Sequence, residues 1–285
     1  MKKNILHDPR LLEIVLLSGM TFLGALFSVP DRSQLFSLNS LLSLLGTICL
    51  FIHIYLYNDW AGYDRDEKDF VKRNRIIYTV GPRITLIISA VTAVLYLLAT
   101  VYLGIPVLGI VMLALSFAYS AKKINLKSVP FIPYLIHYLA ASGHFAMGFY
   151  PFTHKVMPVI RFGLFLGSVF IAGEINQELR DFETDKNNRV FTTVQLFPKK
   201  AVYLTDNALF LLSAVFFRML TDKFGIAPWI FYTYTVLILL YILFSLLFTS
   251  KHGLEMRSFV LLKKVYHMIF WCFGLLLLAE RYLSL

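Results

Sequence analysis

The chain has 285 residues, of which 58% are hydrophobic and 15% charged, with a mean hydropathy of +0.68. Soluble domains average roughly 45–50% apolar and about 25% charged residues, so the composition excludes an ordinary soluble domain and predicts a protein of the lipid bilayer. The net charge of +10 occurs without a soluble basic domain, which argues against nucleic-acid binding and favours attraction to membrane lipid headgroups. Cys49 and Cys272 both lie in apolar runs, so neither a disulfide framework nor a cysteine metal site is expected.

Apolar stretches long enough to cross a bilayer follow one another along the chain. The first, from Leu11 to Val29, is too long for the apolar core of a cleaved signal and is followed by further spans, so we expect it to be retained. The junction between the third and fourth stretches depends only on Gly104 and Pro106. We predict an all-α membrane protein with nine transmembrane helices in a single bundle, near residues 11–29, 38–57, 79–98, 101–120, 130–150, 158–176, 202–220, 226–249 and 264–282.

The positions of Lys and Arg predict the orientation of these spans. Most of the 27 basic residues fall in alternate loops, beginning with the N-terminus, and short cytoplasmic loops collect such residues. This pattern predicts nine spans with a cytoplasmic N-terminus, and merging the third and fourth spans would move the basic loop at 122–127 to the wrong side. A multi-pass integral membrane protein follows, in the cell inner membrane if the protein is bacterial.

Two acidic clusters follow the second and the sixth predicted spans. The first is "NDWAGYDRDEKD" at 58–69, in which a continued helix would place Asp59 and Asp66 within about 20° of each other. The second is "EINQELRDFETD" at 174–185. Four of its acids span about 60° of a helix, and a fifth, Glu183, points the opposite way. The four are Glu174, Glu178, Asp181 and Asp185.

The two clusters are expected on the same cytoplasmic face, because their spans are four crossings apart. This spacing suggests a single domain over 1–285 with a possible four-helix pseudo-repeat, 11–128 and 130–264, although the halves share no strong identity.

Crowded carboxylates repel one another unless a cation compensates them, and ligand sets made only of oxygen suit Mg²⁺. Mg²⁺ binds through carboxylates together with substrate phosphates, so a phosphorylated lipid is the natural partner. Basic segments that could neutralise a diphosphate lie on the same predicted side, at 71–75, 121–127 and 186–189. The alternative is that these charges only solvate the membrane interface, with Arg65, Lys68 and Arg180 pairing with the acids.

Three motifs in chain order resemble the UbiA superfamily of membrane prenyltransferases. The first corresponds to Asn58, Asp59 and Asp66, with Gly62 where the family has a further aspartate, and continues to Asn74 and Arg75. Asp64 is a candidate to replace the missing acid, but it lies about 140° from Asp59 on a regular helix.

The second motif corresponds to Asp181 and Asp185, preceded by Glu178 and followed by Thr192 and Thr193. Between the two acidic motifs, Tyr119 and Lys123 match the family's pattern of Tyr, three residues and Lys. The resemblance covers most of the chain.

The resemblance implies a bundle with a central cavity in which Mg²⁺ ions hold an isoprenoid diphosphate. The metals and basic residues would stabilise the departing pyrophosphate while an acceptor, a small molecule or a lipid, attacks the allylic cation. Aromatic acceptors of quinone or related isoprenoid biosynthesis are the leading class. The implied metal ligands are Asn58, Asp59, Asp66, Glu178, Asp181 and Asp185. The implied diphosphate-binding residues are Asn58, Arg73, Arg75, Lys122, Lys127 and Arg189. The implied catalytic residues are Asp59, Asp66, Asp181, Asp185, Tyr119 and Lys123.

Two other functions are open at this stage. A UbiA-type terpene cyclase would release pyrophosphate without consuming an acceptor. A membrane cation transporter would use acids as an ion path, but the acids here lie at two helix ends and we expect no carboxylates in mid-span. His53, His137 and His144 lie in or near spans without metal-ligand spacing; we interpret them as buried, hydrogen-bonded neutral histidines, with acceptor deprotonation as the alternative.

Overall fold

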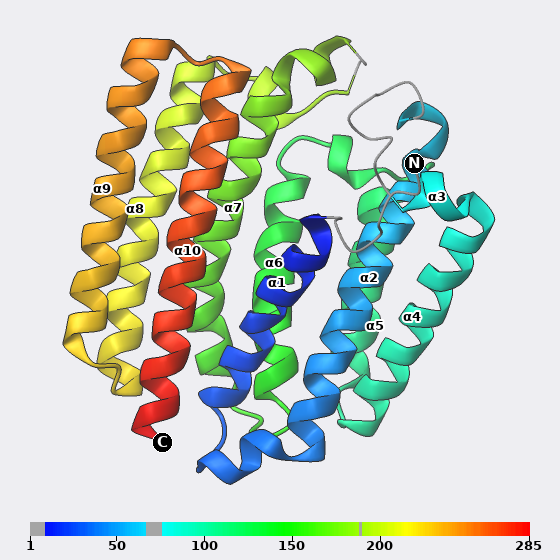
Figure 1. Cartoon of the computed structure of the whole chain (residues 1–285), viewed down its shortest axis with the longest axis vertical. Helices are drawn as coiled ribbons and strands as arrows, with labels where there is room; N and C mark the ends of the chain where they lie inside the picture. The colour runs from blue at the N-terminus through cyan, green and yellow to red at the C-terminus, as the bar shows by residue number, and fades with distance from the viewer. Residues whose placement is uncertain (1–8, 67–75, 188–189) are drawn as a thin grey trace. The chain divides into compact units, whose positions relative to one another are not determined.

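The computed structural model describes residues 9–66, 76–187 and 190–285 (Figure 1), and these ranges contain helices and no strand. The all-α prediction is confirmed for them. The long helices are α1 (Pro9–Leu26), α2 (Leu38–Asp66), α4 (Pro82–Tyr102), α5 (Pro106–Ser120), α6 (Ile132–Phe149), α7 (Val156–Asn187), α8 (Lys199–Phe224), α9 (Pro228–His252) and α10 (Met256–Ser284). The short elements are α3 (Ile77–Val80) and the 3-10 segments η2 (Arg32–Phe36), η4 (Leu126–Ser128) and η5 (Thr193–Gln195).

Each predicted apolar stretch coincides with one of the long helices. Within the described ranges, six helices are long and apolar enough to cross a membrane: α2, α4, α7, α8, α9 and α10. The apolar parts of α1 and α5 are shorter, and α6 is not among the six. Membrane crossing by α1, α5 and α6 therefore stays a prediction.

The junction between the third and fourth predicted spans is a true helix break. α4 ends at Tyr102, and Gly104 takes a φ of 74°, a left-handed conformation that glycine adopts without steric cost. Pro106 then occupies the first turn of α5, where its missing N–H removes no helical hydrogen bond. Two residues with special backbone properties are thus enough to separate the two helices, as predicted.

The chain divides into two compact units. The described part of unit 1, which spans residues 1–126 and 143–154, contains α1 to α5 and the second half of α6. Its core includes a close crossing of α1 and α6, where a Cβ on Gly24 would collide with the carbonyl of Phe145 and one on Gly148 with that of Thr21. This crossing holds α1 against the second half of α6.

Unit 2 spans residues 127–142 and 155–285 and contains α7 to α10, η4, η5 and the first half of α6. Helices α7 to α10 lie side by side (Figure 1). α7 and α8 are antiparallel, because Phe165 packs on Phe217 and Glu183 pairs with Lys199. The acidic end of α7 therefore lies next to the start of α8.

Candidate functional site

In unit 1, the acidic end of α2 is held by an ion pair. The carboxylate of Asp59 is buried and accepts a hydrogen bond from the guanidinium of Arg10 at 2.7 Å. The Tyr55 hydroxyl, one turn earlier, donates to Glu13 at 3.0 Å, and the Arg10 guanidinium lies over the Tyr55 ring. These contacts join the start of α1 to α2 and place a positive charge against Asp59.

The end of α5 reaches the same part of unit 1. The Ser120 hydroxyl donates to the side-chain oxygen of Asn58 at 3.1 Å, and the Lys122 ammonium lies 5.5 Å from the ring centroid of Trp60. Tyr119 is half-buried and Lys123 is exposed. The structure thus brings the segment 119–123 to the first acidic motif, two regions that sequence analysis assigned to one site.

Several predicted site residues lie outside the described part of the chain. Arg73, Arg75 and Arg189 are not described, and nor is the side chain of Asp66. The backbone of α2 does continue through Gly62 to Asp66, so the helix on which the predicted Asp59–Asp66 alignment depends is present.

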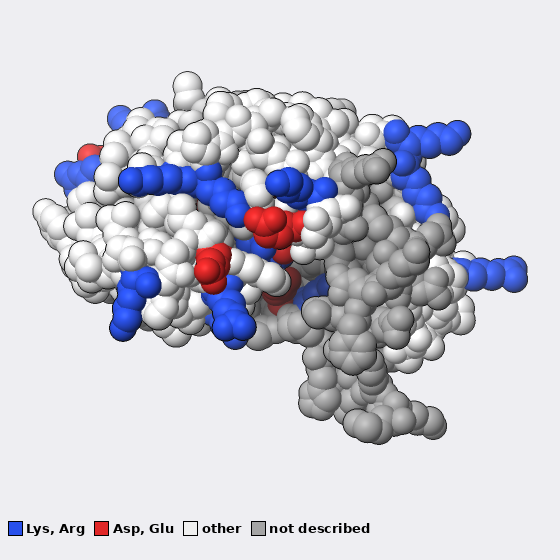
Figure 2. Space-filling model, turned by 90° about the horizontal axis from the view of Figure 1, so that it is seen from above, with Lys and Arg blue, Asp and Glu red and all other residues white. Residues whose placement is uncertain are grey.

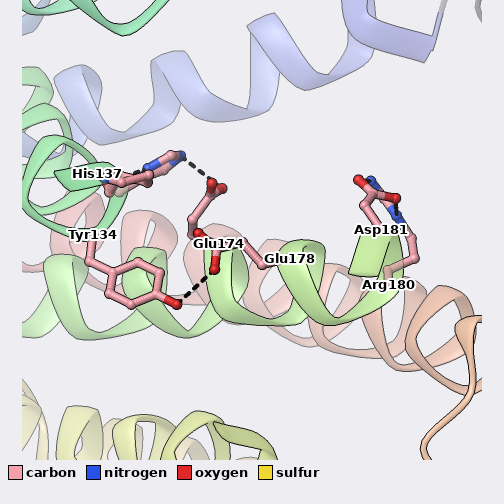
Figure 3. Close-up of polar contacts among 7 residues, drawn as sticks. Tyr134, His137, Glu174, Glu178, Arg180 and Asp181 are labelled. Carbon is pink, nitrogen blue, oxygen red and sulfur yellow. Dashed lines mark hydrogen bonds and ion pairs between the residues drawn. The ribbon is translucent and has the colours of Figure 1, made fainter. Parts of the chain in front are cut away.

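In unit 2, Glu178 is the most deeply buried of the predicted ligands (Figure 3). One carboxylate oxygen accepts the Tyr134 hydroxyl at 3.0 Å and the backbone N–H of Val194, in η5, at 3.3 Å. The other oxygen, Oε1, has no hydrogen-bond partner within the described structure. A buried carboxylate oxygen without a partner is costly unless a bound group completes it.

One turn earlier on α7, Glu174 is also buried, and its carboxylate lies 3.3 Å from His137 Nε2 (Figure 3). His137 and Tyr134 are three residues apart on α6, so they share a helix face and reach two acids one turn apart on α7. Sequence analysis did not name Tyr134, and it gave His137 a role in acceptor deprotonation only as the alternative. The available signal was this i, i+3 spacing on α6, together with the i, i+4 spacing of the acids.

The outer acids of α7 differ from Glu178. Asp181 forms a double hydrogen bond with the neighbouring Arg180, at 2.8 and 2.6 Å, and its side chain is 33% exposed. The pairing of Arg180 with an acid, raised above as the alternative, is therefore present. Glu183 bonds to Lys199 at 2.8 Å, which agrees with its predicted position on the opposite face of α7.

Of the other predicted residues of unit 2, Asp185 lies near the end of α7 and Lys127 lies in η4, before α6. Asp185 and Lys127 are half-buried. On the face seen in Figure 2, basic side chains lie near the acids. Lys186 at the end of α7, Lys200 at the start of α8 and Lys251 at the end of α9 are exposed. This end of the unit therefore offers both metal-binding oxygens and cations for a phosphate group.

The donor chemistry of α7 fits Mg²⁺. All the candidate ligands are oxygens, and the unpaired Oε1 of Glu178 faces no competing donor among the described residues. Across the part of the chain that the structure describes, no three His, Cys, Asp or Glu side chains form a ready-made metal site.

One expectation is wrong. We expected no carboxylates in mid-span, yet Asp206 lies in the first third of α8 and is completely buried. Neither of its oxygens has a hydrogen-bond partner among the described residues. Asp206 lies inside the predicted span 202–220, where a single acid forms no periodic pattern like that of the two acidic clusters.

Comparison with known proteins gives a consistent result. The model of the UbiA prenyltransferase family matches residues 17–274. No curated protein matches the chain in sequence. Among solved structures, a digeranylgeranylglyceryl phosphate synthase is similar with a TM-score of 0.73 and 18% identity, covering 96% of this chain and 95% of that one.

Two archaeal structures are also similar. A UbiA homologue from Aeropyrum pernix K1 has a TM-score of 0.73 at 16% identity, with 93% of this chain and 97% of that chain covered. One from Archaeoglobus fulgidus, bound to DMAPP and Mg²⁺, has a TM-score of 0.64 at 14% identity, with 95% and 97% covered. At these identities, the structural likeness shows a shared fold.

Proposed function

Because this integral membrane protein belongs to the UbiA prenyltransferase family, we propose that it transfers a prenyl or polyprenyl group from an isoprenoid diphosphate to an acceptor, with Mg²⁺. The observation that carries the proposal is the acidic face of α7, where the buried Glu178 retains an oxygen without a partner. The relative from Archaeoglobus fulgidus that binds DMAPP and Mg²⁺ supports this choice of ligands.

We assign metal binding to the acids at the ends of α2 and α7. Bound Mg²⁺ would supply positive charge that stabilises the departing pyrophosphate. Tyr134 and the Val194 N–H fix one oxygen of Glu178, so the other oxygen would be available to hold the metal, while His137 restrains Glu174. The assigned ligands are Asn58, Asp59, Asp66, Glu178, Asp181 and Asp185.

The basic residues of the connecting segments bind the diphosphate in this proposal. Lysine and arginine side chains form charge-assisted hydrogen bonds to phosphate oxygens. The C–O bond of the substrate breaks and its electron pair leaves with pyrophosphate. The acceptor would then form the new bond to the allylic carbon and release a proton, and we assign Tyr119 and Lys123 as catalytic residues for these steps. The assigned diphosphate-binding residues are Asn58, Arg73, Arg75, Lys122, Lys127 and Arg189.

We further propose that α1, α5 and α6 also cross the bilayer, which gives nine spans with the N-terminus and the site on the cytoplasmic side. The basic loops support this orientation. A single cysteine at Lys123 should react with an impermeant maleimide only from the cytoplasmic side of sealed vesicles. A cysteine at Lys155 should react only from the other side, and the opposite result would reverse the topology.

The experiment that tests the function combines purified protein, Mg²⁺ and geranylgeranyl diphosphate with either an aromatic acceptor or a glycerol phosphate lipid. Mass spectrometry should find a prenylated acceptor that is absent when EDTA replaces Mg²⁺. A hydrocarbon product formed without any acceptor would instead identify a terpene cyclase. Cation uptake into proteoliposomes without any diphosphate cleavage would instead identify a transporter.

A further inference from the structure

Unit 2 contains a buried polar layer on the opposite side of α7 from its acidic face. Asn176, Asp206, Asn207 and Tyr241 are 0%, 0%, 6% and 1% exposed. Six of their side-chain atoms have no hydrogen-bond partner within the described residues: both amide atoms of Asn176, both carboxylate oxygens of Asp206, the amide oxygen of Asn207 and the Tyr241 hydroxyl. Each such atom costs about 1–3 kcal/mol if nothing completes it.

The helix register places these side chains at one level. Between α7 and α8, the Phe165–Phe217 and Glu183–Lys199 contacts lie on either side of Asn176, so Asn176 is opposite residues 206 and 207.

The same reasoning applies between α8 and α9. Tyr203 bonds to Ser245 at 2.7 Å and Phe210 packs on Tyr241 with ring centroids 5.0 Å apart. Asp206 lies between these two contacts, next to Tyr241.

The positions of these residues around their helices also agree with a single polar layer. Asp206 and Asn207 fall on the face of α8 that carries Tyr203 and Phe210, within about 100° of one another. On α7, Asn176 shares a face with Glu183, which contacts α8 through Lys199. Three helices therefore direct unpaired polar groups into the same layer.

The chemistry of this layer requires a positive charge. An ionised carboxylate cannot remain buried and unpaired, so Asp206 must bind either a proton or a cation. A proton would neutralise the charge but satisfy only one oxygen, whereas the layer contains four acceptor oxygens from Asn176, Asp206 and Asn207. A single carboxylate balances one positive charge, which favours a monovalent ion, and hard cations prefer oxygen ligands.

We propose that Asp206, with the side-chain oxygens of Asn176, Asn207 and Tyr241, forms a binding site for a small alkali cation of the Na⁺ class. The bound ion joins α7, α8 and α9 and stabilises unit 2. The site is separate from the diphosphate site, and the proposal does not depend on the proposed function.

Thermal unfolding of the purified full chain tests the site without any prenyl substrate. The melting temperature of the wild-type protein should rise in a saturable way when NaCl replaces choline chloride at constant ionic strength. At ten times the dissociation constant, the expected rise is about 3 °C or more. Asp206→Asn, which keeps the shape and removes the charge, should abolish the rise. Asp222→Asn on the exposed end of α8 is the matched control and should keep it.

A second variant covers the case in which Asp206→Asn does not fold. Tyr241→Phe removes one ligand oxygen and should raise the Na⁺ concentration at half-maximal stabilisation several-fold. The proposal is wrong if LiCl, NaCl and KCl all leave the wild-type melting temperature at its choline value. It is equally wrong if the Na⁺ response survives in Asp206→Asn, or if only pH, and no alkali ion, shifts the melting temperature through Asp206.

Discussion

At their acidic ends, the two units stabilise a buried carboxylate in different ways. In unit 1, the buried Asp59 already has a cationic partner, Arg10, at 2.7 Å. In unit 2, the buried Glu178 is held only by neutral donors, the Tyr134 hydroxyl and a backbone N–H, and one oxygen stays without a partner among the described residues. Arg10 thus compensates the buried acid of the first end. At the second end, Asp181 and Glu183 pair with Arg180 and Lys199, whereas Glu178 has no cationic partner among the described residues.

This difference indicates that the ends of α2 and α7 have different roles before and during metal binding. A buried carboxylate that is paired with an arginine is stable without metal, so the end of α2 can keep its shape before substrate binds. Among the described residues, Glu178 accepts hydrogen bonds only from neutral donors, so a bound Mg²⁺ would meet no competing cation at its second oxygen. The two ends should therefore respond differently to substitution.

The largest expected effect is on turnover. Asp59→Ala and Asp181→Ala should each reduce Mg²⁺-dependent product formation by about 10³-fold or more, because each removes a proposed ligand of the Mg²⁺ that would stabilise the leaving group. Product formation measured by mass spectrometry is the readout. Glu183→Gln, on the opposite face of α7, is the control and should stay close to wild type. Asp64→Ala should reduce turnover less than Asp59→Ala does. Near wild-type turnover in Asp59→Ala would contradict the assignment of α2 to the site.

A smaller effect is expected on the stability of unit 1. Arg10→Ala removes the cation that pairs with the buried Asp59 and should cost about 3 kcal/mol, because removing one partner of a buried ion pair is strongly destabilising. The melting temperature in detergent is the measurement. The double variant Arg10→Ala with Asp59→Asn should regain most of that loss. If the double variant is as unstable as Arg10→Ala alone, the ion pair is not what stabilises this end.

The close crossing of α1 and α6 should be sensitive to a single methyl group. Gly148→Ala would place a Cβ against the carbonyl of Thr21 and should destabilise the protein by about 2 kcal/mol. Gly19→Ala, on α1 with no heavy atom within 4 Å of the new Cβ, is the matched control and should be neutral or slightly stabilising. Equal melting temperatures for the two variants would contradict the close packing of α1 against α6 at Gly148.

The smallest effect is expected at the neutral donors of unit 2. Tyr134→Phe removes one hydrogen bond to Glu178 and should lower stability by about 1–2 kcal/mol, with the loss reduced when Mg²⁺ is present. Tyr232→Phe, whose ring is 62% exposed on α9, is the control. If Mg²⁺ stabilises Tyr134→Phe no better than wild type, Glu178 is not linked to the metal.

The helices and the acidic face of α7 were predictable because they follow from short-range rules. Apolar length predicted each helix position, and the 100° helical period predicted that Glu183 would point away from the other four acids. The break at Gly104 and Pro106 was visible for the same reason. The backbone properties of these two residues were sufficient to predict the helix break.

The partners of the acids could not be predicted, because they come from distant parts of the chain. Arg10 lies 49 residues from Asp59, and Tyr134 lies 44 residues from Glu178. No local periodicity connects such pairs, and only packing decides them. Asp206 was overlooked for a different reason: a single acid in an apolar span has no pattern, although its cost in a membrane marks it as functional.

The most direct test of the central claim is Mg²⁺-dependent binding of a diphosphate analogue with a non-cleavable prenyl linkage, measured by titration calorimetry. The wild-type protein and Glu183→Gln should bind the analogue only when Mg²⁺ is present. Asp59→Asn and Asp181→Asn should each lose this binding while they remain folded. Undiminished binding by both of these variants, or binding that ignores Mg²⁺, would contradict the account.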